Sequence, residues 1–138
     1  MSMPASSALV SPQPSTIVKQ QHITVAEPWF TFIKAGEKTV EGRLCRGMFA
    51  GLQVGSLLSV TRSNAQAQEA CMHACMVEVS VTCVNRYASF EQYLTDEGLA
   101  KTLPGVHSIS EGVAVYHQFY TPQQESEHGV LAIHILVV

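Results

Sequence analysis

Alternating apolar and polar residues along the chain predict five β-strands. Four stretches with a period of two, at 22–25, 38–44, 56–61 and 71–84, have the pattern of half-buried strands. A mostly apolar stretch at 129–138 has the pattern of a buried final strand. The polar residues 64–69 predict a hairpin tip between the third and fourth strands.

Helical spacing appears in three segments. Pro28 suits the first helical position, and the helix at 29–35 places three apolar side chains on one stripe: Trp29, Phe32 and Ile33. Ser89 is suited to be the N-cap of a helix over 90–97. A capping box at 108–111 starts a third helix that runs to about Tyr120, and Pro122 is expected to end it.

The order of these elements indicates the fold class. The strands between residues 38 and 84 follow one another without crossover helices, which excludes a βαβ rhythm. We therefore expect an α+β fold, a small mixed β-barrel of about five or six strands with two or three short helices at its ends.

The ends and cysteines of the chain bear on its organisation. Residues 1–20 are rich in Ser, Pro and Ala and lack the features of a secretory or mitochondrial signal, so we expect a disordered tail before one domain at 21–138. No stretch reaches the roughly 18 to 20 apolar residues of a membrane helix. Without a secretory signal, four cysteines are expected to be free thiols in the cytoplasm or nucleus: Cys45, Cys71, Cys75 and Cys83.

The charge distribution narrows the search for a binding site. A net charge of −3 excludes a bulk polyanion binder. Residues 1–86 nevertheless hold seven basic and five acidic side chains, whereas residues 87–138 hold one basic and six acidic. Four of the eight basic residues lie within thirteen positions: Lys34, Lys38, Arg43 and Arg46. An anionic ligand is expected there.

Three charged residues on the strand at 38–44 are the main candidates for chemistry. Glu41 and Arg43 share one strand face, about 6 to 7 Å apart, and Lys38 lies at the mouth of the strand. Arg43 can hold a phosphate or carboxylate with its planar fork. Glu41 can accept from the amino edge of a cytosine-like base or activate water, and Lys38 can polarise a carbonyl or act as a base. The alternatives are a lysine at a helix C-terminus and a plain surface ion pair.

Other clusters have weaker support. Cys71, His73 and Cys75 share a strand face that can hold a metal, but the same face continues with valines, so buried inert cysteines are favoured. Cys45 with His107 or His117 is a possible nucleophile and base, but only neighbouring arginines would activate that thiol. We expect no metal and no cofactor.

The segment 28–44 resembles the signature of the ASCH domain family. In that family a helix ends in Gly-x-Lys and a strand carrying Glu-x-Arg follows, which is similar to Gly36-Glu37-Lys38-Thr39-Val40-Glu41-Gly42-Arg43. The resemblance continues over about residues 22–138, through Val54-Gly55, Tyr87-x-Ser-Phe90, Glu111 to Tyr116, and Phe119-Tyr120.

The resemblance implies a PUA-like β-barrel with a cleft beside the signature, and RNA or nucleotides as ligands. One bacterial subgroup hydrolyses N4-acetylcytidine with a Lys and, three residues later, a Thr. The Lys corresponds to Lys38, but Glu41 occupies the Thr position. Hydrolase activity therefore does not carry over directly.

Three hypotheses follow. The leading one is binding of RNA or a modified nucleoside or nucleotide in a cleft lined by Lys38, Glu41 and Arg43, with Lys34 as a further ligand-binding residue and Tyr116 or Trp29 as a stacking wall. The second is a small amidohydrolase acting on an N4-acylated cytosine nucleoside, in which Glu41 activates water and Lys38 stabilises the oxyanion. The third is a protein-interaction module. The sequence leaves open whether the chain is an enzyme, and its oligomeric state.

Overall fold

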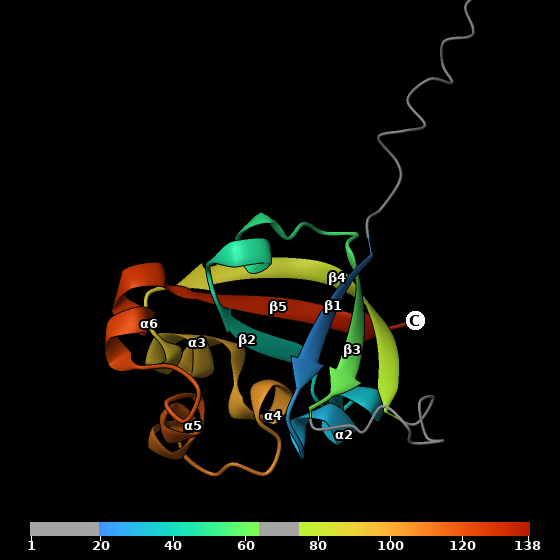
Figure 1. Ribbon diagram of the computed structural model, residues 1–138. Coiled ribbons are helices and arrows are strands. Elements are labelled where there is room, and N and C mark those ends of the chain that lie inside the picture. The colour runs from blue at the N-terminus through green and yellow to red at the C-terminus, as the bar shows by residue number, and fades with distance from the viewer. Residues whose placement is uncertain (1–19, 64–74) are drawn as a thin grey trace, which may run out of the picture.

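The computed structural model describes residues 20–63 and 75–138 (Figure 1). The expected tail over 1–19, the hairpin tip at 64–69, Cys71 and His73 lie outside the described residues. Gln20, which the prediction assigned to the tail, is the first residue of a strand. In the described part of the chain, no helix is long and apolar enough to cross a membrane.

The described residues form one five-stranded mixed sheet, which confirms the predicted fold class. The strands are β1 (Gln20–Val25), β2 (Val40–Leu44), β3 (Leu57–Arg62), β4 (Met76–Tyr87) and β5 (Val130–Val137). Their order in the sheet is β1-β3-β4-β5-β2. β1 pairs with β3 in parallel, and the other pairs are antiparallel. The sheet curls into a half-barrel, so that β1 and β3 cross in front of β5 and β2 (Figure 1).

The inside of the curl is filled by branched aliphatic side chains. β-branched residues favour strands because they pack well on a pleated surface. The cluster includes Ile23, Val60, Val79, Val81 and Ile133. The helix α2 (Trp29–Lys34) packs against this core with Phe30 and Ile33. The predicted stripe was therefore wrong in part: Ile33 is buried and Trp29 packs against the core, but Phe30 is buried in place of Phe32.

The outside of β2 and β5 is covered by helices (Figure 1). These are α3 (Phe90–Glu97), α4 (Leu99–Thr102), α5 (Ile109–Tyr116) and α6 (Pro122–His128). Their second core cluster packs Phe90, Tyr93 and Leu94 against Val40 and Val130. Both faces of β2 are therefore buried, and the strand holds its polar side chains inside the protein.

Three helices differ from the predictions. The expected helix to Tyr120 ends at Tyr116, and Pro122 begins α6 instead of ending a helix. Pro122 can do so because its missing N–H has no partner to lose in the first turn. Thr121 caps α6 reciprocally with Gln124. α4 has four residues, which is too short for a helical period to appear in the sequence.

The inward face of β4 also differs from the prediction. The alternation placed Val79, Val81 and Cys83 toward the core. The pairing with β5 shifts between Val81 and Cys83, and this bulge reverses the parity. Val84 packs against the core instead, and the Cys83 thiol lies 3.6 Å from Oδ1 of Asn85.

Candidate functional site

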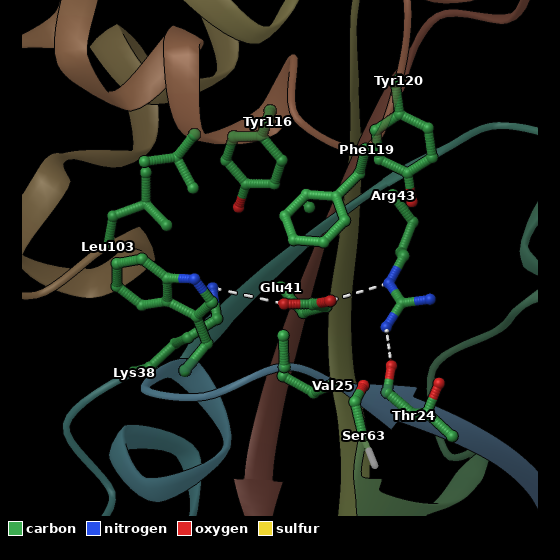
Figure 2. A pocket seen from close by; sticks show the side chains of 14 residues that line it. Thr24, Val25, Lys38, Glu41, Arg43, Ser63, Leu103, Tyr116, Phe119 and Tyr120 are labelled. Atoms are coloured by element: carbon green, nitrogen blue, oxygen red, sulfur yellow. Dashed lines mark hydrogen bonds and ion pairs between the residues drawn. The ribbon is translucent and has the colours of Figure 1, made fainter.

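A cavity lies where the two edge strands of the sheet approach each other. β1 and β2 are the first and last strands of the sheet and do not pair. Instead, the Arg43 guanidinium on β2 donates from Nη2 to the Thr24 carbonyl on β1 at 2.6 Å. A cavity of about 220 Å³ lies beside this link. Helix α5 and the residues that follow it, including Phe119 and Tyr120, form its opposite wall (Figure 2).

The floor of the cavity is a buried chain of three charges. The Glu41 carboxylate lies between two cations, with Oε1 3.3 Å from Lys38 Nζ and Oε2 2.7 Å from Arg43 Nε (Figure 2). The shared strand face of Glu41 and Arg43 is as the sequence indicated. Lys38 reaches the same carboxylate, despite its opposite parity, because it precedes β2 rather than belonging to it.

Lys38 is one of the most deeply buried side chains of the described protein, at 2% exposure. Its ammonium group donates to the carbonyl oxygens of Val40 at 2.8 Å and of Thr102, in addition to Glu41. An ammonium group has three N–H donors, so these contacts use all three. Burial lowers the pKa of Lys38, and the charge of Glu41 opposes this shift. Lys38 therefore holds β2, α4 and Glu41 together.

Glu41 is the anionic group that the cavity presents. Burial by itself favours the neutral carboxyl, but the charges of Lys38 and Arg43 outweigh burial and hold the pKa of Glu41 below its ordinary value. A carboxylate has about four lone-pair sites, and the contacts with Lys38 and Arg43 use two. The remaining sites can accept hydrogen bonds from a ligand.

Arg43 is fixed in its orientation from several sides. Burial opposes its charge, but the neighbouring Glu41 carboxylate outweighs burial and raises the pKa of Arg43 above its ordinary value. The guanidinium also lies over the Phe49 ring, 5.0 Å from the ring centre, in a cation–π contact. Its orientation is therefore set before any ligand binds.

Aromatic residues line the wall opposite the charges. Tyr116 is buried, stacks on Phe90 with ring centres 4.4 Å apart, and shares a 2.8 Å hydrogen bond with the Tyr93 hydroxyl. One face of the Tyr116 ring is therefore already covered. Phe119 is 55% exposed and lines the same cavity as Glu41 (Figure 2). Phe119 is the more accessible stacking surface.

Gly42 makes room for this wall. A Cβ atom at position 42 would lie 2.7 Å from the Cζ and hydroxyl oxygen of Tyr93. Real Cβ atoms essentially never approach so closely, so the strand needs glycine between Glu41 and Arg43. Tyr93 can then extend to the Tyr116 hydroxyl beneath the cavity.

The structure brings together five of the six site residues predicted from sequence. Lys38, Glu41, Arg43, Tyr116 and Trp29 all line the cavity. Lys34 is exposed on α2 and is not among the residues that line it. The hypotheses missed several lining residues: Thr24, Ser63, Leu103, Phe119 and Tyr120. The family resemblance pointed at Phe119 and Tyr120, but strand parity gave no signal for the others.

The alternative clusters find little support. His117, a candidate base for Cys45, places Nε2 2.8 Å from the Glu125 carboxylate. Cys45 packs against the core inside the half-barrel. Over residues 20–63 and 75–138, no group of three or more His, Cys, Asp or Glu residues is arranged to hold a metal ion.

Comparison with known proteins identifies the family. The chain is similar to the crystal structure of the hypothetical protein PH0355 from Pyrococcus, with a TM-score of 0.72 and 32% identity, covering 87% of this chain and 100% of that one. It is also similar to the solution NMR structure of PF0455 from Pyrococcus furiosus, with a TM-score of 0.65 and 30% identity, covering 87% of this chain and 98% of that one. No curated protein matches the chain. The ASCH domain matches residues 23–138, and the chain therefore belongs to the ASCH domain family.

Proposed function

We propose that this ASCH domain binds a single nucleobase in the cavity beside Glu41. The base belongs to a modified nucleoside or nucleotide, or to an RNA strand. The observation that carries the proposal is the ionised Glu41 carboxylate on the floor of the cavity, held in place by Lys38 and Arg43. Lys38 and Glu41 are buried and the Arg43 side chain is only 16% exposed, which argues against a plain surface ion pair.

The open lone pairs of Glu41 favour a base that carries N–H donors. Carboxylates accept from the exocyclic amino group of cytosine in nucleic-acid recognition. Adenine and guanine also carry amino groups, whereas uracil carries a carbonyl in place of the cytosine amino group. We therefore expect uridine to bind more weakly than cytidine, because its O4 would face a fixed negative charge.

The size and walls of the cavity favour one base over a longer strand. Its volume of about 220 Å³ lies below the roughly 300 to 1,000 Å³ of pockets that enclose drug-sized ligands. The exposed Phe119 ring at the cavity offers a stacking surface. Stacking on an aromatic side chain contributes about 1 to 3 kcal/mol per base.

The contacts of Lys38 support binding more than hydrolysis. Its three donors are occupied by two backbone carbonyls and Glu41, so the ammonium group has none left for an oxyanion. Glu41 has a lowered pKa, which weakens it as a general base for water. Hydrolysis of an acylated cytosine would require both groups to be released from each other.

Isothermal titration calorimetry tests the proposal. The ligands are the four ribonucleosides, N4-acetylcytidine and a five-nucleotide single-stranded RNA. Phe119→Ala is expected to weaken binding about 5- to 150-fold through lost stacking. Its matched control is Val54→Ala, because Val54 is similarly exposed, at 68%, and does not line the cavity. Glu41→Gln is expected to abolish the preference for cytidine over uridine, with Glu37→Gln as its control.

Two results would contradict the proposal. One is that no nucleoside and no RNA binds the folded wild type. The other is that Phe119→Ala and Glu41→Gln both bind like the wild type while circular dichroism shows them folded. Chromatography of the N4-acetylcytidine samples separates binding from catalysis, because release of cytidine and acetate would assign hydrolysis to the same cavity.

A further inference from the structure

A second depression lies on the other side of Arg43. Its volume is about 320 Å³, and the residues that line it include His22 and Thr24 of β1, Thr61 of β3, Arg43, and Phe49 of the short 3-10 helix η3 (Gly47–Gly51). Thr24 and Arg43 line both the cavity and this depression. The hydrogen bond from Arg43 to the Thr24 carbonyl therefore lies at the boundary between the two hollows.

The Arg43 guanidinium has donors left for this depression. Nε donates to Glu41 and Nη2 donates to Thr24. Within the described residues Nη1 makes no hydrogen bond, and Figure 2 shows the third nitrogen of the group pointing away from both partners. A guanidinium has five N–H donors, two of them on Nη1. The planar fork of arginine matches a phosphate group, and here its orientation is already fixed by Glu41, Thr24 and Phe49.

The other groups around the depression suit an anion. The Thr24 and Thr61 hydroxyls and the exposed His22 imidazole can all donate. Lys38 and Arg43 are positive and Glu41 is negative, which leaves one net positive charge on the buried chain. The acidic residue Glu78 is not among the residues that line the depression. It lies on β4, two strands away from His22 on β1, and its carboxylate accepts a hydrogen bond from the Gln20 side chain at 2.8 Å.

We propose that the second depression binds the phosphate group of the nucleotide whose base lies in the cavity. This inference rests on the proposed function and deepens it, because it makes a nucleotide rather than a nucleoside the full ligand. Arg43 then serves both parts of one ligand: Nε positions Glu41 for the base, and Nη1 binds the phosphate. The phosphate comes from a free mononucleotide or from the backbone of an RNA.

Calorimetry on the full chain tests this with each ribonucleoside, its 5′- and 3′-monophosphates, inorganic phosphate and a five-nucleotide RNA. A monophosphate is expected to bind at least about 10-fold more tightly than its nucleoside, as for hydrogen bonds to charged groups. In His22→Ala and Thr61→Val this affinity ratio is expected to fall toward one. The control His107→Ala, an exposed histidine that lines neither hollow, is expected to keep the wild-type ratio.

The outcomes separate the two proposals. If nucleosides bind but no monophosphate binds more tightly, the phosphate site is wrong and the base site stands. If the ratio survives in both His22→Ala and Thr61→Val, the phosphate binds elsewhere and the inference is overturned. If neither nucleosides nor nucleotides bind, the proposed function itself fails. An RNA that binds more tightly than every mononucleotide, with a preference lost in the variants, supports the site and identifies the RNA backbone as the source.

Discussion

The side chain of Arg43 joins the two edge strands of the sheet by donating to the Thr24 carbonyl at 2.6 Å. β1 and β2 have no ladder between them, so the half-barrel stays open at this seam. One guanidinium spans the opening and, through Nε, also holds the carboxylate at its floor. The cavity therefore lies at the seam where the sheet does not close.

Replacing Arg43 by lysine should destabilise the fold even though the charge is kept. A lysine ammonium is a point charge and cannot hold Glu41 and the Thr24 carbonyl with a planar fork. Arg43→Lys is expected to lower the free energy of unfolding by about 1.5 to 3 kcal/mol, the range for hydrogen bonds to charged groups. Urea denaturation measures this loss. Arg46→Lys is the control, since Arg46 is exposed, and equal stability of the two variants would contradict the bridging role.

Gly42 should not tolerate a side chain. A Cβ atom would meet the Tyr93 ring at 2.7 Å, and Tyr93 is fully buried and cannot move aside freely. Gly42→Ala is expected to cost about 1 to 3 kcal/mol of stability, as for overpacked cores. Gly51→Ala is the matched control, because a Cβ atom there meets nothing within 4 Å. Thermal denaturation of both variants decides the point, and a Gly42→Ala protein as stable as Gly51→Ala would refute the packing argument.

The sequence predicted the sheet and part of the site because both depend on local periodicity. Strands with one buried face alternate with a period of two, and the same parity placed Glu41 and Arg43 together, as their 2.7 Å contact confirms. Lys38 has the other parity, yet it reaches Glu41 because the residues before a strand are free of that rule. Lys38 also donates to the Thr102 carbonyl, 64 residues away, a contact that no local pattern encodes.

The elements that the sequence predicted wrongly or missed depend on competing signals. The sequence around Pro122 is equally consistent with the end of one helix and with the first residue of the next. Only the course of the chain after Tyr116 in the folded protein distinguishes the two. The bulge before Cys83 reverses strand parity without leaving a glycine as its mark. The cover on Tyr116 comes from Phe90 of another helix, so its limited use as a stacking surface became visible only in three dimensions.

Removing the buried ammonium group should be costly. Lys38→Met leaves the Val40 and Thr102 carbonyls without their donor and Glu41 without one cation. Breaking a buried pair in this way costs about 3 to 5 kcal/mol. Lys101→Met on α4 is the control, because Lys101 is exposed, and it is expected to be nearly neutral. Chemical denaturation measures the free energy of unfolding. A loss in Lys38→Met no larger than in the control would show that Lys38 does not hold these elements together.

The loss of unfolding free energy at acid pH should depend on Glu41. Its pKa in the folded protein lies below the ordinary 4.5, because Lys38 and Arg43 outweigh the opposing effect of burial. Its contribution is therefore complete above about pH 4.5 and is lost as the pH falls through the lower folded value. The difference in unfolding free energy between wild type and Glu41→Gln should be largest above pH 4.5 and shrink at lower pH. A Glu41→Gln curve parallel to the wild type would show that this carboxylate gains nothing from its two cations.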